Sequence, residues 1–315
     1  MRSEPFQLRA SDGAALFVNH FEPDPPRTVR AAVQLVHGMG EHGARYERLA
    51  RALCERGFAV FAADCRGHGQ TAASEADLGH FADRDGWEKV VGDVRALGQH
   101  VAATHPGVAR VLVGHSMGSF IALDFLTRFG DTVHAAVLSG SAPSAGPLGW
   151  IFRALASAER LRLGARGESA LLRQLLFGRF NSAFEPARTP FDWLSRDEDE
   201  VAKYIADPRC GFVLRAGSFA DFAAGLSRFQ QRRVLSRIPH ALPVYLIAGE
   251  VDPVGGGAGV TRLAEELGRA GLERVDVRIY PGGRHEMLNE TNRDEVTRDL
   301  CAWIEKALPA VPPSR

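Results

Sequence analysis

A serine set between two glycines is the first feature of this sequence that could do chemistry. Gly114-His115-Ser116-Met117-Gly118 is the only G-x-S-x-G segment in the chain. The apolar run Val111–Val113 precedes it and the helical pattern Ser119–Phe129 follows it. A tight strand–turn–helix connection of this kind exposes a serine hydroxyl, and its glycines allow backbones to approach closely. We predict that Ser116 is a nucleophile; the structural alternative is a glycine-rich helix start with Ser116 as N-cap.

A serine hydroxyl needs a base, and in this arrangement an acid and then a histidine follow the nucleophile along the chain. Of the eleven histidines, only His285 lies beyond the apolar run Pro243–Ala248. Two carboxylates, Glu250 and Asp252, follow that run, and Asp252 is favoured because it lies further past the strand end. We predict that His285 is the general base and that Asp252 orients it, with Glu250 holding the loop. A histidine that caps the following helix is the structural alternative for His285.

The segment His37-Gly38-Met39-Gly40-Glu41-His42 follows another short apolar run. One backbone N–H from such a loop, together with that of the residue after the nucleophile, binds the oxyanion that forms during acyl transfer. We predict that Met39 and Met117 supply these two N–H groups. His37 and His42 also raise the question of a metal, but no further ligands fall at suitable spacing and a zinc site needs three or four. We therefore predict loop packing for both histidines, with no metal and no cofactor.

Short apolar runs closed by glycine alternate with segments of helical spacing along most of the chain. Such runs are typical of buried strands in a parallel sheet, and the alternation indicates an α/β fold with helices on both faces. The turn signal Ser11-Asp12-Gly13 between two alternating stretches predicts an opening hairpin. The predicted hairpin strands are Phe6–Ala10 and Ala15–Phe21, and the buried runs are Ala31–Val36, Phe58–Ala63, Val111–Val113, Ala135–Leu138, Pro243–Ala248 and Val275–Tyr280. The helical patterns are Arg45–Arg56, Trp87–His105, Ser119–Phe129 and Val260–Ala270.

Residues 144–238 break this alternation, because they contain helix-like segments but no convincing buried strand. Ser195 and Glu198 fit a capping box with Ser195 at the N-cap, and Asp221–Gln231 predicts another helix. We expect a core made of 1–143 and 239–315, with 144–238 inserted as a helical cap over the carboxyl ends of the strands. Ligands bind at that edge in open α/β sheets.

An apolar stripe lies within the predicted cap. It consists of Leu171, Leu172, Leu175, Leu176 and Phe177. Most such stripes are the packing face of a helix, but over a binding site the alternative is a surface through which lipid enters. The second interpretation implies transient contact between the cap and a membrane.

Composition excludes several classes of protein. With 45% hydrophobic and 24% charged residues, the 315-residue chain has the balance of a folded globular protein. Lys+Arg and Asp+Glu both number 38, so no net field attracts nucleic acid, and we expect no nucleic-acid partner. The four cysteines are far apart, which favours reduced thiols. No signal peptide is evident and no window approaches the roughly 18 apolar residues of a spanning helix, so we expect a cytoplasmic location.

Taken together, these motifs resemble those of monoacylglycerol lipases and related lysophospholipase-like hydrolases of the serine aminopeptidase-type branch. Asp64-Cys65-Arg66-Gly67-His68-Gly69 completes the series in the core, and two cap segments, 188–197 and 207–212, extend it. The resemblance covers nearly the whole core and implies an α/β-hydrolase fold, with a mostly parallel sheet flanked by helices and an inserted helical cap. One departure is Ser119, which stands where many relatives carry a third glycine.

The resemblance implies hydrolysis of monoacylglycerols or lysophospholipids through an acyl-enzyme, without a cofactor. The same triad also serves short-chain carboxylesterases and amide or peptide hydrolases, whose acyl pockets are smaller or more polar. A third reading is a non-catalytic ligand sensor of the same fold. Such proteins usually lose a member of the triad, whereas Ser116, Asp252 and His285 are all present. The oligomeric state is left open.

Overall fold

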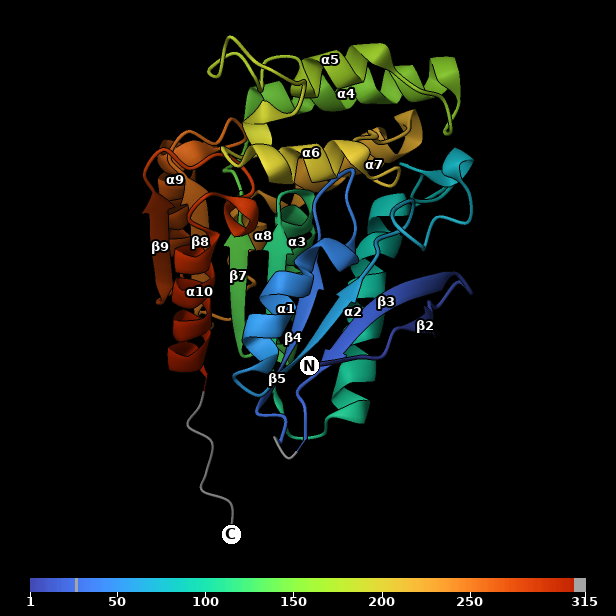
Figure 1. Ribbon diagram of the computed structural model, residues 1–315. Helices are drawn as coiled ribbons and strands as arrows, with labels where there is room; N and C mark the ends of the chain where they lie inside the picture. The colour runs from blue at the N-terminus through green and yellow to red at the C-terminus, as the bar shows by residue number, and fades with distance from the viewer. Residues whose placement is uncertain (26–27, 309–315) are drawn as a thin grey trace.

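The computed structural model describes residues 1–25 and 28–308. A central β-sheet lies between two layers of helices, and further helices lie above one end of the strands (Figure 1). The predicted class, a mostly parallel sheet flanked by helices, is confirmed. Within the described residues the sheet has nine strands. They are β1 (Arg2–Ser3), β2 (Phe6–Arg9), β3 (Ala15–Glu22), β4 (Ala31–Val36), β5 (Phe58–Ala63), β6 (Ala109–His115), β7 (Ala135–Ser139), β8 (Val244–Gly249) and β9 (Val275–Tyr280).

The strand order β1-β3-β5-β4-β6-β7-β8-β9 places the parallel part of the sheet from β5 to β9, with β2 paired to β3 in the predicted hairpin. All residues of β4 are buried, and Val33 pairs with Val60 on one side and Val111 on the other. Central strands covered on both faces need apolar residues throughout, which explains why their sequences do not alternate.

The last strand differs from the expectation. Val275–Tyr280 is a strand as predicted, but it is only partly buried, because it lies at the edge of the sheet and pairs only with β8. Its central residues, Asp276 to Arg278, are exposed. An edge strand has only one neighbour to cover it, so polar residues are tolerated there.

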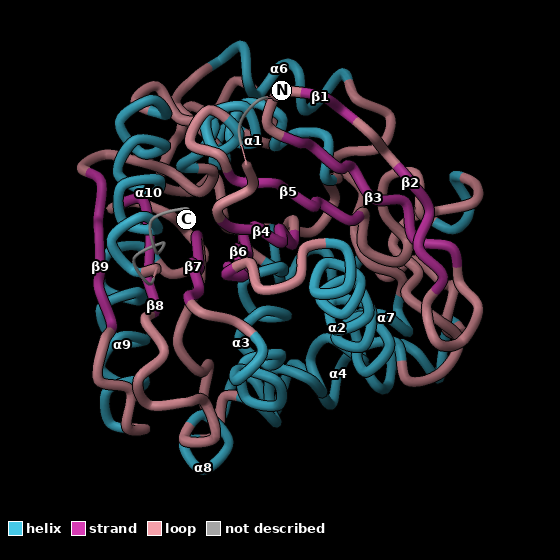
Figure 2. Tube along the Cα trace, turned by 90° about the horizontal axis from the view of Figure 1, so that it is seen from below, coloured by secondary structure: helices cyan, strands magenta, loops and turns pink. Residues whose placement is uncertain are grey.

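Five helices cover the two faces of the sheet (Figure 2). Apolar residues of α1 and α10 pack on one face, and those of α2, α3 and α9 pack on the other. Both faces are therefore sealed from water, and the ends of the strands are left to form a site. These helices are α1 (Glu47–Cys54), α2 (Gly86–Thr104), α3 (Met117–Phe129), α9 (Gly256–Arg269) and α10 (Arg293–Ala307).

The chain between β7 and β8 forms helices and no strand within the described residues, and Figure 1 shows α4 to α7 above the upper ends of the strands. Helix α7 packs against α4, α2 and α3, which connects this layer to the rest of the molecule. The helices are α4 (Pro147–Leu163), α5 (Ala170–Phe177), α6 (Glu198–Ala206), α7 (Ala216–Phe229) and α8 (Arg232–Leu235).

The predicted start of α6 is wrong by two residues. The N-cap is Asp197, whose carboxylate accepts hydrogen bonds from the N–H groups of Asp199 and Glu200. Ser195 does not cap the helix: its Oγ accepts the N–H of Asp197 at 2.9 Å, one residue before the helix begins, and its hydroxyl donates to the carbonyl oxygen of Asn289 at 2.8 Å. Ser195 and Asp197 are both good capping residues, and a partner distant in sequence decided between them.

Helix α7 approaches α2 at Gly225. A Cβ on Gly225 would lie 2.6 Å from Nε1 of Trp87 and closer still to two carbons of the same ring. The ring cannot move aside, because Phe222 and Phe229 pack against it and Asp124 accepts its N–H. Glycine at this position therefore lets α7 lie close enough to α2 to hold Phe222 over the strand ends.

We expect Gly225→Ala to lower the free energy of unfolding by about 1–3 kcal/mol, the usual cost of overpacking. Gly92→Ala is the matched control, because it lies in α2 with no atom within 4 Å of the added Cβ. That substitution should raise the free energy of unfolding by about 0.5–1 kcal/mol, since alanine is the better helix former. Urea denaturation of the three proteins measures both effects, and equal stability of wild type and Gly225→Ala would contradict the packing argument.

Candidate active site

Ser116 lies at the turn between β6 and α3, with φ 51° and ψ −120°. A non-glycine residue with positive φ is strained by roughly 1–3 kcal/mol and persists only where the surroundings enforce it. Its hydroxyl makes no capping hydrogen bond to α3, although the residue occupies the N-cap position. The side chain is thus held at a sharp turn without serving the helix, which is the geometry of a nucleophile elbow.

Close backbone contacts enforce this turn. A Cβ on Gly118 would lie 2.6 Å from the carbonyl oxygen of His37 and closer to that of Val36, and a Cβ on Gly114 would lie 2.8 Å from Cα of Ser119. Ser119 itself fits: it is buried, and its hydroxyl donates to the carbonyl oxygen of Ser116 at 2.6 Å. Ser119 therefore adds a hydrogen bond to the elbow.

His285 and Asp252 come together from two loops that follow neighbouring strands, β9 and β8. Nδ1 of His285 lies 2.9 Å from Oδ1 of Asp252, and both side chains are buried. The N–H of Val254 donates to the same carboxylate oxygen at 2.8 Å. Because Nδ1–H donates to Asp252, Nε2 of His285 is left as the acceptor that a general base requires.

The second carboxylate of this loop has a different contact. Oε2 of Glu250 accepts the N–H of Gly282 at 2.9 Å, so this side chain ties the loop after β8 to the loop that carries His285. Of the two candidates considered from the sequence, Asp252 contacts the imidazole and Glu250 contacts backbone.

Two opposing effects act on the pKa of His285. Burial lowers it, but the adjacent Asp252 carboxylate, together with the carboxylates of Glu286 and Glu41, raises it, and the pKa lies above the usual 6.5. His115 lies beside it, with ring centroids 4.9 Å apart, and burial and the neighbouring His285 lower its pKa. The site therefore holds one imidazole that binds a proton more readily than usual and one that binds it less readily.

The loop that carries Met39 is positioned by His37. Nε2 of His37 accepts the N–H of Cys65 at 2.8 Å, so its proton is on Nδ1, which donates to the carbonyl oxygen of Gly38 at 2.7 Å. Burial lowers the pKa of His37 to about 3, which keeps this single tautomer neutral. The loop-packing role expected for His37 agrees with these contacts.

A buried charge network that the sequence reasoning missed joins this loop to the histidine loop. Oε1 of Glu41 accepts the N–H of Gly38 at 2.6 Å, and Oε2 of Glu41 accepts from Arg45 at 2.7 Å. The same guanidinium donates to both oxygens of Glu286 at 2.7 Å. Glu41 and Glu286 were visible only as parts of motifs, and nothing in their spacing indicated that Arg45 would lie between them.

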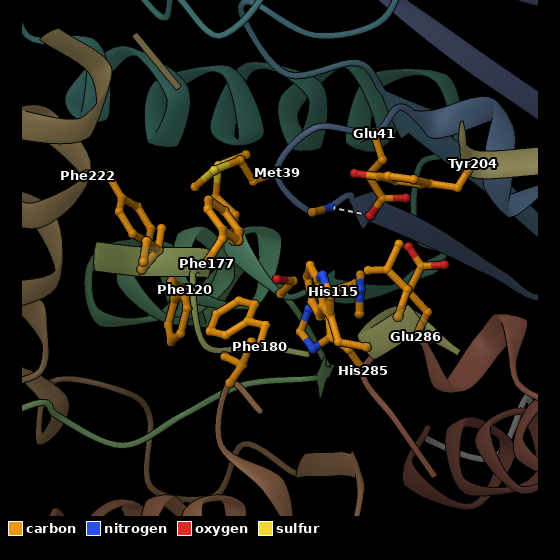
Figure 3. Close-up of a pocket in the computed structure, with 17 residues that line it drawn as sticks. Met39, Glu41, His115, Phe120, Phe177, Phe180, Tyr204, Phe222, His285 and Glu286 are labelled. Carbon is orange, nitrogen blue, oxygen red and sulfur yellow. Dashed lines mark hydrogen bonds between the residues drawn. The ribbon is translucent and has the colours of Figure 1, made fainter. Parts of the chain in front are cut away.

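A pocket with a cavity volume of about 70 Å³ opens at Ser116 and His285. Met39 and Met117, the predicted oxyanion residues, line it beside the serine. Figure 3 shows its two ends: phenylalanines from the core and from the layer above gather on one side of His115 and His285, and carboxylates and a tyrosine lie on the other. The apolar end comprises Met39, Phe120, Phe177, Phe180 and Phe222, and the polar end comprises Glu41, Tyr204 and Glu286.

His42 has partners that the spacing of the sequence did not indicate. Its Nε2 lies 2.9 Å from Oδ2 of Asp207, and Cys210 completes a group whose potential ligand atoms all lie within 4.8 Å of one another. The loop-packing role expected for His42, with no metal, stays a prediction; the spacing of the sequence did not indicate that Asp207 and Cys210 reach His42 from a distant segment of the chain.

Comparisons with known proteins agree with this geometry. The family described as serine aminopeptidase, S33, matches residues 27–292. The chain belongs to this family. It is an α/β-hydrolase of the lipase and esterase type and resembles monoacylglycerol lipases, as the motifs implied.

Several relatives align over nearly their full length. The chain is 28% identical to the monoacylglycerol lipase of Mycolicibacterium smegmatis, covering 89% of this chain and 90% of that protein. It is 29% identical to the monoglyceride lipase of Homo sapiens, covering 97% and 93%. A thermostable carboxyl esterase from Bacillus coagulans, crystallised with glycerol, superposes with a TM-score of 0.89 at 28% identity over 98% of this chain and 99% of that one.

A base role for His285 predicts a specific pH dependence. The imidazole must be neutral to accept a proton, and its pKa is raised, so kcat/KM for an ester should fall as the pH drops through a value above 6.5. Asp252→Asn removes a carboxylate that raises this pKa, so the acidic limb of the pH–rate profile should move to lower pH. The value of kcat should also fall by about 10⁴-fold.

Glu250→Gln is the matched control, because Glu250 contacts the Gly282 N–H and not the imidazole. It should leave the acidic limb where it is. A limb that does not move in Asp252→Asn, or that moves equally in both variants, would contradict the assignment of the acid.

Proposed function

We propose that this protein is a serine hydrolase that cleaves monoacylglycerol esters through an acyl-enzyme. The observation that carries the proposal is the pocket at Ser116, which is apolar at one end and carboxylate-lined at the other. The relatives named monoacylglycerol lipase and monoglyceride lipase support the same substrate class.

The proposed reaction uses the residues in the order of the triad. Ser116 attacks the ester carbonyl while Nε2 of His285 takes its proton, and Asp252 stabilises the imidazolium. The N–H groups of Met39 and Met117 bind the oxyanion of the tetrahedral intermediate. His285 then protonates the departing glycerol oxygen, and water, activated by the same imidazole, releases the fatty acid and restores Ser116.

The two ends of the pocket suit the two parts of a monoacylglycerol. The phenylalanine-lined end removes an acyl chain from water, worth roughly 0.8 kcal/mol for each buried methylene group. At the other end Glu41, Tyr204 and Glu286 offer acceptors for glycerol hydroxyls. Arg45 balances only one of the two carboxylates, so the remaining negative charge disfavours a phosphate. We therefore favour monoacylglycerol over lysophospholipid.

We further propose that residues 144–238 act as a cap domain on a core of 1–143 and 239–315. Leu176 and Phe177 of α5, Tyr204 of α6 and Phe222 of α7 all line the pocket. The acyl pocket would then depend on the cap for most of its apolar wall, and the cap would select chain length.

Fatty-acid release from a medium-chain monoacylglycerol tests the proposal. Wild type should turn over, and Ser116→Ala should reduce kcat by about 10⁶-fold while remaining folded. A fluorophosphonate should label wild type at Ser116 and leave the variant unlabelled. Folded wild type that neither labels nor turns over would contradict a serine mechanism and would favour the ligand-sensor reading.

The choice of substrate is tested by comparing esters that carry the same acyl chain on different head groups, and by varying the length of that chain. The rate should rise with chain length and should be lower for a lysophospholipid than for the monoacylglycerol. Faster hydrolysis of a two- to four-carbon ester or of an amide would instead identify a short-chain carboxylesterase or amide hydrolase with this triad.

We also propose that the outer surface of the cap contacts lipid. Helices α4 and α5 are outermost at the top of Figure 1. Leu148 and Ile151 of α4 are 72% and 57% exposed, and Leu171 and Leu175 of α5 are 46% and 52% exposed. The apolar stripe expected in α5 therefore does not form a single face: Leu172 is buried, whereas Leu171 and Leu175 are exposed. Among the described residues, no helix is both long and apolar enough to cross a membrane.

The double substitution Leu148→Ser/Ile151→Ser should reduce binding to phosphatidylcholine vesicles about tenfold or more, because each apolar side chain contributes roughly 1.5–3 kcal/mol when buried in lipid. Val277→Ser is the matched control, since Val277 is 39% exposed but lies on the edge strand β9, away from α4 and α5. Co-sedimentation measures the partitioning. Equal binding of both variants and wild type would rule out this surface as the contact.

A further inference from the structure

His42, Asp207 and Cys210 form a group of chemically distinct ligands outside the catalytic triad. His42 follows the loop that carries Met39, and Asp207 and Cys210 belong to the turn that ends α6. Their potential ligand atoms lie within 4.8 Å of one another, and all three residues are partly exposed. Imidazole, carboxylate and thiol together are a combination suited to zinc.

The geometry needs little adjustment to hold such an ion. Ligand atoms bound at zinc distances to a tetrahedral ion lie about 3.3–3.8 Å apart, so the largest separation here would close by no more than about 1.5 Å. The backbone already supports the site: Oδ1 of Asp207 accepts the N–H of Arg209 at 2.8 Å, and Cys210 N–H donates to the Asp207 carbonyl oxygen at 3.0 Å. Asp207 also lines an open surface cavity, which gives an ion access from solvent.

The charges around the group are mixed. The positive charge of Arg45 acts on Cys210 and that of Arg209 acts on Asp207. The carboxylates of Glu41 and Glu286 also act on Cys210, and that of Asp64 interacts with His42. Burial raises the pKa of the Cys210 thiol, so the sulfur carries its proton when no metal is bound. Binding would form a metal–sulfur bond and release that proton to solvent.

We infer that His42, Asp207 and Cys210 form a three-ligand site for a zinc-like divalent cation, with a fourth position open to water. A bound metal would stabilise the contact between these segments. The segments are already joined by the hydrogen bond from the Gly211 N–H to the Gly40 carbonyl oxygen at 3.0 Å and by the His42–Asp207 contact at 2.9 Å. A metal would replace the His42–Asp207 contact with coordinate bonds that also include Cys210. The loaded protein should therefore melt at a higher temperature.

Chelator-treated full-length protein is titrated with zinc in competition with a chromophoric chelator, and separately with Co²⁺. We expect one equivalent of zinc and a thiolate-to-cobalt charge-transfer band in the near ultraviolet. Cys210→Ser should abolish the band and weaken zinc binding at least tenfold, and Asp207→Asn should weaken it by a similar factor. Cys54→Ala is the matched control, because Cys54 is buried in α1 away from this group, and it should leave both signals intact.

Equal zinc affinity of wild type and Cys210→Ser, or a wild type without the cobalt band, would overturn the inference. Circular dichroism establishes that each variant is folded, and if Cys210→Ser is not, Asp207→Asn decides the question. The titrations use no ester substrate, so their outcome is independent of the proposed lipase activity.

Discussion

Arg45 lies between two buried carboxylates, Glu41 and Glu286, and much of the site depends on this arrangement. Removing one member of a buried ion pair leaves an uncompensated charge, at a cost of about 3–5 kcal/mol. Here the network also fixes backbone, because Glu41 accepts the N–H of Gly38 while Glu286 directly follows His285. The loop proposed to bind the oxyanion and the loop that carries the proposed base are thereby held by one guanidinium.

The elbow at Ser116 adds a second constraint of a different kind. Its positive φ is enforced by contacts at Gly114 and Gly118, where no side chain fits between β6, α3 and the end of β4. The ion network positions the partners of the serine, and backbone packing positions the serine itself. The inserted segment takes part in the first constraint, because Arg45 lies 4.8 Å from the ring centre of Tyr204 in α6 and the Glu286 N–H donates to the carbonyl oxygen of Leu194 at 2.7 Å.

Local patterns predicted the core well and the helices above it poorly. The bounds of Ala31–Val36, Phe58–Ala63 and Val275–Tyr280 match the structure, because short apolar runs closed by turn residues have few alternative conformations. The start of α6 was misplaced, since Ser195 and Asp197 can both cap a helix and the Asn289 carbonyl, 94 residues from Ser195, decides between them. The exposure of β9 was also missed, because the order of strands in a sheet is not a local property.

The sequence by itself determined the elements of the proposed chemistry: a serine in a glycine-bounded turn, followed by an acid and a histidine after successive strands. These follow from backbone sterics and chain order, which act over a few residues. The tertiary structure alone decided the two-ended pocket, the meeting of Arg45 with Glu286 across 241 residues, and the approach of Asp207 and Cys210 to His42. The physical reason is that charge pairing, ligand grouping and pocket polarity arise where distant segments pack together, and residue spacing does not encode that packing.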